Sequence, residues 1–335
     1  MENSKKLKKE ENDILELDKQ VINETIRDKK KYILNNIKIQ RWEGDLSIDS
    51  YSIEIKKDNS SFTGILNGKF ERDGYGINKF PNGDIYFGYF ENDQRNRHGI
   101  YFYSPEKKDK IIHEECYYGF WLNNKKNNHG IYLWIDEPEN NIDFDNANFD
   151  CFIGNVKDDH YNKGCYLSKI EDNYYLYYGN FDEDGTKNDN NALFYSSSDK
   201  LIKGKIVNDN FIEGYVAFYD SETGKLINFV YCKFDNDGSI IFLKKDSEFG
   251  NNKEIEKIKQ EMFLFRDVIL EIDYFGDIYQ KYKDIKKFVN ENMNSIRRFN
   301  DREKITEMIE LCVDYNSLDI YSKIEKIVYH KKKKR

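Results

Sequence analysis

The chain has 335 residues, a mass of 40.1 kDa and a formal net charge of −8. Hydrophobic residues make up 39 % and include 26 Tyr, which argues against a thick apolar core, and the aromatic share of 16 % favours pleated sheet over a helical bundle. No apolar run approaches the roughly 18–20 residues that cross a bilayer, and the N-terminus lacks signal-peptide and myristoylation motifs, so we expect a cytoplasmic protein.

Charge divides the chain into three parts. Residues 1–37 carry 9 basic and 8 acidic side chains, residues 38–249 carry 25 and 37, and residues 250–335 carry 19 and 16. An acidic middle part repels phosphate backbones, which argues against nucleic-acid binding there. We expect the same three parts to be domains, because the sequence pattern changes at both boundaries.

The first part is predicted to be an N-terminal helical segment. Ile14, Leu17, Val21 and Ile22 recur among many charged residues, as on one face of an amphipathic helix.

A repeated pattern fills residues 38–249. Each copy has an aromatic or bulky residue, a glycine two positions later, and a second bulky residue two positions after the glycine. The seven glycines are Gly44, Gly64, Gly88, Gly119, Gly154, Gly179 and Gly204, and they follow Trp42, Phe62, Tyr86, Tyr117, Phe152, Tyr177 and Ile202. An eighth copy around Cys232 has lost the glycine and is interpreted as a degenerate end unit.

A second signal follows each first aromatic by 12 to 15 residues. It places a glycine before an alternating aromatic strand, at Gly76, Gly99, Gly130, Gly164 and Gly214, with Ala192 in the equivalent place of another unit. Polar segments such as 123–128 supply the turn residues between the two strands. Each unit is therefore a β-hairpin, and about sixteen strands in a meander would give a sheet on the order of 75 Å long.

The spacing gives the glycines a structural role. Two residues apart on a strand, the aromatic and the glycine point to the same face of the sheet. We expect a ring from a neighbouring strand to lie across each bare glycine. The glycines are then ring seats rather than parts of a phosphate-binding loop.

Residues 62–88 resemble the MORN (membrane occupation and recognition nexus) repeat. They contain its G-x-G element, Gly74-Tyr75-Gly76, and its N-G-x-x-Y element, from Asn82 to Tyr86. Later units look like drifted copies with longer turns, and the resemblance covers about residues 40–245. It implies a mainly β fold, an elongated single-layer antiparallel meander of stacked MORN hairpins.

The third part, residues 250–335, is predicted to be a helical region with a basic tail. One helical seam consists of Ile255, Ile258, Met262, Phe265, Ile269 and Ile272, and a second of Ile278, Tyr282, Ile285 and Val289. Gly276 is expected to break the first helix, and 300–301 and 316–317 to cap two more. These helices either close the open sheet edge or bind a partner or a second copy, and the width of the stripe favours packing within the chain.

Signatures of catalysis are absent from the sequence. It has no nucleotide-binding, zinc-protease or hydrolase motif, and its five cysteines form no C-x-x-C pair. His113-Glu114-Glu115-Cys116 is interpreted as a charged turn, and the calcium-like Asp235-Asn236-Asp237-Gly238 as a hairpin turn. We therefore predict no catalytic residue, no cofactor and no metal.

The resemblance to MORN proteins implies a non-enzymatic scaffold or adaptor in a cytoskeletal, ciliary or cortical assembly such as those of protists, located at an axoneme or cell cortex. The aromatic face would then line a trough for an extended peptide or helix, with an acidic rim that favours basic segments. The candidate partner-binding residues are Tyr86, Tyr117, Trp121, Phe152 and Tyr177. The alternative is that these rings are seated on glycines as pure structure.

Two other functions stay open. The tail could contact anionic lipid such as phosphoinositides and tether the protein to a membrane, through Lys331, Lys332, Lys333, Lys334 and Arg335; a solvated end or a nuclear-import signal would have the same composition. The protein could also be a regulatory subunit of an enzyme, because MORN arrays precede catalytic domains in other family members. Self-association is a further possibility for the helices.

Overall fold

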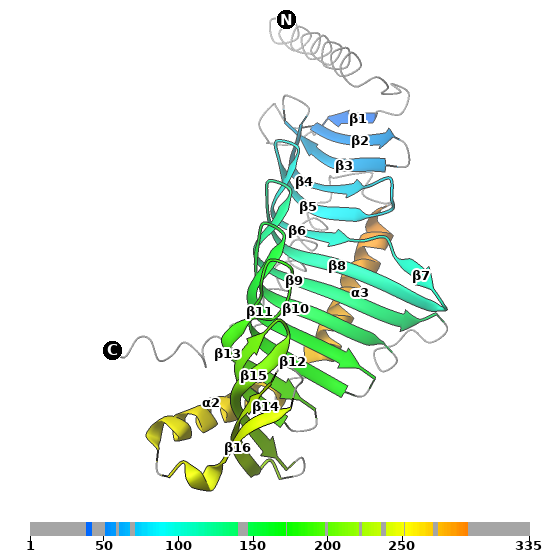
Figure 1. Ribbon diagram of the computed structural model, residues 1–335. Helices are drawn as coiled ribbons and strands as arrows, with labels where there is room; N and C mark the ends of the chain where they lie inside the picture. The colour runs from blue at the N-terminus through cyan, green and yellow to red at the C-terminus, as the bar shows by residue number, and fades with distance from the viewer. Residues whose placement is uncertain are drawn as a thin grey trace, which may run out of the picture.

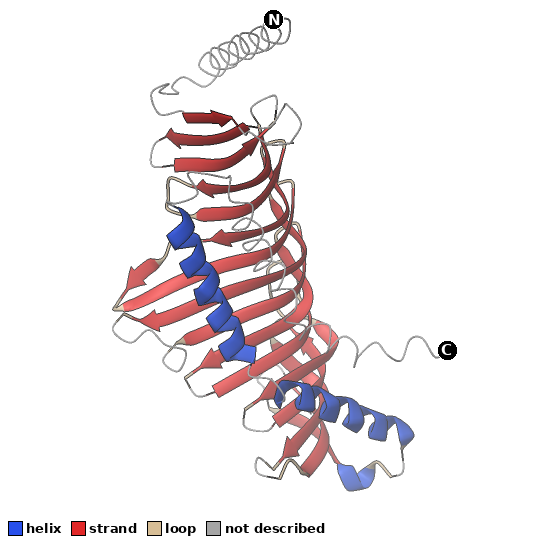
Figure 2. Ribbon diagram, turned by 180° about the vertical axis from the view of Figure 1, so that it is seen from behind, coloured by secondary structure: helices blue, strands red, loops and turns tan. Residues whose placement is uncertain are grey.

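The computed structural model describes residues 38–41, 51–57, 60–67, 71–139, 147–171, 173–197, 200–220, 223–235, 239–250, 252–270 and 274–293. They form one elongated antiparallel sheet with two helices against one of its faces (Figures 1 and 2). The predicted mainly β meander is thereby confirmed. The N-terminal helix, the Trp42 and Gly44 unit and the last two predicted helices lie outside the described residues.

The strands follow the chain in order across the sheet. Each pairs with the next, except that β6 pairs with β8 while the short β7 extends along one end of β8. The bounds are β1 Lys38–Arg41, β2 Tyr51–Lys57, β3 Ser60–Leu66, β4 Arg72–Lys79, β5 Ile85–Glu91, β6 Gln94–Phe102, β7 Glu106–Lys108, β8 Ile111–Leu122, β9 Lys125–Pro138, β10 Asn148–Lys157, β11 His160–Ile170, β12 Asn173–Asn180, β13 Asp189–Ser196, β14 Lys200–Val207, β15 Asn210–Tyr219, β16 Leu226–Phe234 and β17 Ile240–Lys245, followed by η2 Asp246–Glu248, α2 Lys253–Leu270 and α3 Tyr274–Met293.

Two-residue turns close several of the hairpins. In the turn from β5 to β6, Asn92 and Asp93 have φ of 48° and 66°, and Asn123 and Asn124 in the turn from β8 to β9 have 50° and 69°. Two successive positive φ angles give the primed turn that matches the twist of paired strands, and Asn and Asp tolerate them better than other side chains. The polar turns of the sequence thus fix the strand register.

Alternation along each strand separates two apolar clusters. Tyr86 and its neighbour Phe87 are both buried, but Tyr86 belongs to the cluster on the face that carries the glycines and Phe87 to the cluster on the other face. We call these the glycine face and the helix face. The second name applies because the buried residues of α2 and α3 belong to the same cluster as Phe87.

Both helices use the predicted seams. Helix α2 buries Ile255, Met262 and Phe265, and α3 buries Ile278 among other residues of its series. Figure 2 shows α3 lying across the strands, so this helix covers a face of the sheet rather than its edge. Burying an apolar face explains this placement, because the helix face would otherwise expose its whole cluster to water.

The expectation for Gly276 is wrong. Helix α2 ends at Leu270, and α3 begins at Tyr274, so Gly276 lies in the first turn of α3. A glycine costs a helix only about 1 kcal/mol relative to alanine, and the buried side of α3 outweighs that cost.

A buried carboxylate on β8 anchors α3. Tyr282 Oη donates a hydrogen bond of 2.5 Å to Glu114 Oε2, and Lys286 forms an ion pair with the same carboxylate. Lys283 Nζ lies 3.8 Å from Glu114 Oε2. Glu114 is 7 % exposed, so its negative charge is stabilised by the Lys and Tyr side chains of α3 and hardly by hydration.

A second buried carboxylate, on β9, has the same arrangement. Glu137 is 1 % exposed, accepts a hydrogen bond from Tyr279 Oη, and lies 2.6 Å from Lys283 Nζ. The two carboxylates therefore bind Tyr and Lys side chains on successive turns of α3, and these contacts fix the position of α3 along the sheet.

Acidification is expected to weaken this anchor. Burial alone would raise the pKa of Glu114, but the hydrogen bonds from Lys286 and Tyr282 and the charges of Lys286 and Lys283 outweigh it and lower the pKa below the ordinary 4.5. A carboxyl with a lowered pKa stabilises the fold above its unfolded-state pKa, and this stabilisation is lost as the pH falls through the folded-state value. The difference in unfolding free energy between wild type and Glu114→Gln should be largest near pH 7 and shrink below pH 4.5. Denaturant titrations at a series of pH values measure it, and a difference that does not change with pH would contradict the prediction.

Candidate functional site

A row of glycines crosses the sheet at one register. Cross-strand partners run without interruption through Gly64, Gly76, Gly88, Gly99, Gly119, Gly130, Gly154, Gly164 and Gly179, and a second run consists of Ala192, Gly204, Gly214 and Cys232. Six of the seven predicted structural glycines lie in this row, and Gly44 is outside the described residues. The second glycine of each hairpin thus lies opposite the first.

In the hairpins of Tyr86, Tyr117 and Phe152, one ring covers both the glycine on its own strand and the glycine opposite it on the next strand. A Cβ on Gly88 or on Gly99 would lie 2.6 Å from Cζ of Tyr86, which precedes Gly88 by two residues. The expectation of a ring from a neighbouring strand is therefore correct for Gly99 and wrong for Gly88, whose ring comes from the same strand. Residues two apart share a face, and without a side chain on Gly88 the Tyr86 ring is free to lean along its strand and across to the next one.

The tyrosine hydroxyls end at a bulge. Tyr86 Oη donates to the Tyr89 carbonyl at 3.1 Å, and the strand register slips between Gly88 and Tyr89. The same bond to the residue three positions on is made by Tyr117 at 3.3 Å and by Tyr177 at 2.8 Å. At Tyr86 and Tyr117 the accepting carbonyl lies at a register slip, and at Tyr177 the Asn180 carbonyl also accepts the Asn188 N–H at 3.0 Å.

The five candidate partner-binding residues are all buried. Tyr86, Tyr117, Trp121, Phe152 and Tyr177 are 0–1 % exposed. The indole Nε1 of Trp121 donates to the Gly99 carbonyl at 3.1 Å, and burial raises the pKa of Tyr117 and Tyr177 well above the ordinary value of 10. These side chains form the floor of the glycine face, so a partner on this face would first meet the rings beside them.

The reachable rings lie in the second strand of each hairpin. Tyr101 pairs across the sheet with Tyr86 and Tyr117, and Tyr166 pairs with Phe152 and Tyr177. Tyr101 and Tyr166 are half-buried, as are Phe194, Tyr103 and Trp134. The sequence signal for three of them, Tyr101, Tyr166 and Phe194, is a ring two residues after Gly99, Gly164 or Ala192, the second small residue of the unit.

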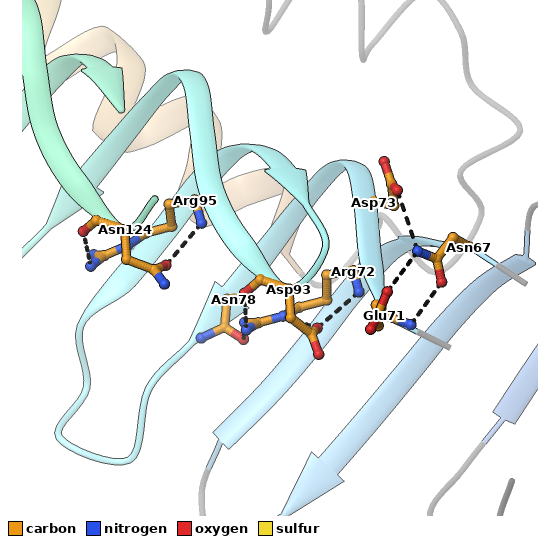
Figure 3. Close-up of polar contacts among 8 residues, drawn as sticks. All are labelled: Asn67, Glu71, Arg72, Asp73, Asn78, Asp93, Arg95 and Asn124. Atoms are coloured by element: carbon orange, nitrogen blue, oxygen red, sulfur yellow. Dashed lines mark hydrogen bonds and ion pairs between the residues drawn. The ribbon is translucent and has the colours of Figure 1, made fainter. Parts of the chain in front are cut away.

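Hydrogen bonds between turns tie one hairpin to the next (Figure 3). Asp93 Oδ1 accepts the Arg72 backbone N–H at 2.9 Å, and the Asp93 N–H donates to the Arg72 carbonyl at 3.0 Å. Asn124 makes the same two bonds with Arg95, at 2.9 and 3.0 Å. The positive φ of each turn residue turns its side chain and its N–H towards the preceding hairpin.

The same positions carry cations that lie over the rings of the glycine face. Arg72 Cζ lies 4.7 Å from the centre of the Phe90 ring, and Arg95 Cζ lies 4.3 Å from that of Trp121. The remaining pairs are Lys126 Nζ with Tyr132 at 4.4 Å and Lys187 Nζ with Tyr166 at 4.8 Å. Cations over ring faces are attracted by the ring quadrupole, most strongly where water is excluded. We call Arg72, Arg95, Lys126 and Lys187 the cation row.

Carboxylates hold the ring hydroxyls. Tyr101 Oη donates to Asp84 at 2.6 Å, and Tyr132 Oη donates to Glu115 at 2.8 Å. The glycine face therefore combines apolar ring surface with both signs of charge, which is the chemistry of a recognition surface.

A histidine on β8 pairs with a carboxylate on β9. His113 Nδ1 lies 2.6 Å from Asp136 Oδ1, and in the described ranges no group of His, Cys, Asp and Glu is arranged to hold a metal ion. Neither α2 nor α3 has the length and apolarity that a membrane-crossing helix needs.

Comparison with known families points to two of these hairpins. A family model for the MORN repeat matches residues 86–105 and 117–137. The first matched segment covers β5 from its second residue and all of β6, and the second covers β8 from Tyr117 onward and β9 except its last residue. No curated protein sequence matches the chain.

Proposed function

Because this chain is a MORN-repeat protein, we propose that it is a non-enzymatic adaptor that holds a segment of another protein against its glycine face. MORN repeats are protein- and membrane-interaction modules, and their family is typically non-enzymatic. The observation that supports a protein partner is the continuous row of half-buried rings beside the glycine row.

These rings suit a binding surface for three reasons. Tyr and Trp present a large apolar area with a polar tip and lose little conformational entropy on binding. The positions of Tyr101 and Tyr166 are fixed beforehand, because each pairs across the sheet with a fully buried ring on both sides. The two described helices cover the opposite face, so among the described residues the glycine face carries no helix.

The assembly that the adaptor serves is proposed to be cytoskeletal, at a cilium, an axoneme or the cell cortex. Resemblance to other MORN proteins supports this part of the proposal. The tail Lys331 to Arg335, on which the membrane-tether alternative depends, lies outside the described residues.

Site-specific photo-cross-linking tests the proposal. A photoreactive phenylalanine is placed at Trp134 or at Tyr166 in the full-length protein inside its native cells, and cross-linked peptides are identified by mass spectrometry. Leu122 is the control, because it is exposed and follows Trp121 on β8, so that it faces the other side of the strand. We expect Trp134 and Tyr166 to capture the same protein and Leu122 not to. Equal capture at Leu122, or none at the two rings, would refute the proposed surface.

A further inference from the structure

The outer members of the cation row have carboxylate partners. Arg72 Nε lies 3.0 Å from Asp93 Oδ1, and Lys187 Nζ lies 3.3 Å from Asp209 Oδ1. In each case the carboxylate belongs to the turn that bonds to the cation's own backbone. The charge of these two cations is thus neutralised within the hairpin array.

The two central members do not have such a partner. For Arg95, the turn residue that accepts its backbone N–H is Asn124, an uncharged amide in place of an aspartate. The Arg95 guanidinium donates to the Asn124 carbonyl at 2.8 Å. Asp159 accepts the backbone N–H of Lys126 at 2.8 Å, but it forms no ion pair with the Lys126 ammonium. Among the residues that the structure describes, no carboxylate lies within ion-pair distance of either side chain.

Both central cations are half-buried, and Arg95 shows the effect of that burial. Removal from water lowers the pKa of its guanidinium, against the smaller effects of nearby Tyr and Asp groups. A partly desolvated cation without a counter-ion binds an incoming anion more strongly than an exposed one, because part of its hydration is already lost. The arrangement therefore favours the binding of an anionic group at these cations.

Reachable rings surround these cations. Arg95 Cζ lies 5.2 Å from the Tyr101 ring centre, and Lys126 Nζ lies 5.5 Å from that of Tyr103. The Tyr101 and Tyr103 ring centres are 4.7 Å apart. The Tyr103 ring stacks on the Tyr132 ring, which in turn stacks on Trp134. An anionic group at the cations would thus have apolar surface directly beside it.

We propose that Arg95 and Lys126 bind an acidic side chain of a partner protein whose neighbouring aromatic or aliphatic residue packs on Tyr103 and Trp134. This rests on the proposed function and names the chemistry of the segment bound. It differs from the basic segment that net charge alone would favour. A protein segment is preferred to an anionic membrane because residues 38–249 carry 25 basic and 37 acidic side chains, so an extended anionic surface is repelled where a short segment is not.

A pair of synthetic copolymers tests the charge preference. The probes are a random copolymer of glutamate and tyrosine and its counterpart of lysine and tyrosine, each titrated into the full-length protein at physiological salt. Binding is followed by tryptophan fluorescence, to which Trp121 and Trp134 both contribute from the proposed site. We expect the glutamate copolymer to bind at least about tenfold more tightly than the lysine copolymer, with an affinity that falls as salt is added.

Charge-neutralising variants locate the binding. Arg95→Gln with Lys126→Gln should weaken binding of the glutamate copolymer at least about tenfold. The matched control is Arg97→Gln with Lys125→Gln, which removes the same number of positive charges from exposed side chains two positions from Arg95 and one position from Lys126. It should change binding less than about twofold. Lys126→Gln alone, and the salt titration of the wild type, provide the test if the double variant does not fold, as judged by its thermal melt.

Each other outcome overturns the inference in a distinguishable way. Equal loss in both double variants would show non-specific attraction, and absence of glutamate-copolymer binding would remove the anion site. Binding of vesicles of phosphatidylserine and phosphatidylcholine that depends on Arg95 and Lys126, without copolymer binding, would make the site a lipid contact. Tighter binding of the lysine copolymer would refute the charge preference but leave the proposed function intact, because cross-linking at Trp134 and Tyr166 tests that function independently of charge.

Discussion

Gly154→Ala is expected to lower the free energy of unfolding by about 3 kcal/mol or more. Gly154 lies on β10 in the middle of the glycine row, and an added Cβ would lie 2.5 Å from the Gly164 Cα, closer still to the Lys163 carbonyl oxygen, and 2.9 Å from the Phe152 ring. Two of these atoms belong to the backbone of the neighbouring strand and cannot rotate away. The strands have to separate locally, and the seated Phe152 ring is displaced with them.

Gly250→Ala is the matched control for this effect. No atom lies within 4 Å of a Cβ at Gly250, but its φ of 63° is left-handed, so alanine there costs only the backbone strain of about 1 kcal/mol. Urea titration of both variants gives the comparison. Equal destabilisation by the two would mean that loss of backbone freedom, rather than ring seating, accounts for the glycine row.

Glu137→Ala is expected to destabilise the packing of α3 by about 2–4 kcal/mol. It removes a buried acceptor from Tyr279 and a counter-ion from Lys283. Loss of one partner of a buried ion pair costs about 3–5 kcal/mol, and the cost is smaller here because the Lys283 side chain is 25 % exposed and its charge can reach water. Hydrogen exchange of the α3 amides and denaturant titration both measure the effect.

Glu139→Ala is the control for Glu137→Ala. Glu139 pairs with Lys107 at 2.5 Å, but the two side chains are 39 % and 59 % exposed, so the pair contributes at most about 1 kcal/mol. A loss of stability in Glu139→Ala as large as in Glu137→Ala would show that the carboxylates act through general charge. Unchanged exchange of α3 in Glu137→Ala would show that apolar contacts alone hold the helix.

Local patterns of residues predicted most of the sheet. A glycine two residues after a ring, with a second small residue one strand later, occurs in every described unit from Phe62 to Tyr177, and the unit that follows has Ile202 in place of the ring. The strand pairing follows from these patterns because consecutive strands are joined by short turns. The helical seams of α2 and α3 were predicted for the same reason, since the period of apolar residues is local information.

Local patterns did not predict which side chains remain accessible. Tyr86 and Tyr101 are both aromatic residues two positions from a glycine, yet Tyr86 is fully buried and Tyr101 is half-buried. The difference arises because the Tyr86 ring covers two glycines, Gly88 on its own strand and Gly99 on the next. The space above these two glycines holds one ring, so the Tyr101 ring lies beside it. Which ring takes the seat depends on pairing between strands, and a single strand does not contain that information.

The sequence by itself determined the repeated hairpin, its turns, its glycine row and the amphipathic helices, because each depends on residues a few positions apart. Only the tertiary structure decided that α3 lies on the sheet face. There Tyr279 and Tyr282 donate hydrogen bonds to Glu137 and Glu114, which lie 142 and 168 residues earlier in the chain. The tertiary structure also decided that, within the described part of the chain, no carboxylate pairs with Arg95 or Lys126 as one does with Arg72 and with Lys187. Ion pairs and burial depend on how distant segments meet in space, and no local spacing of residues encodes that meeting.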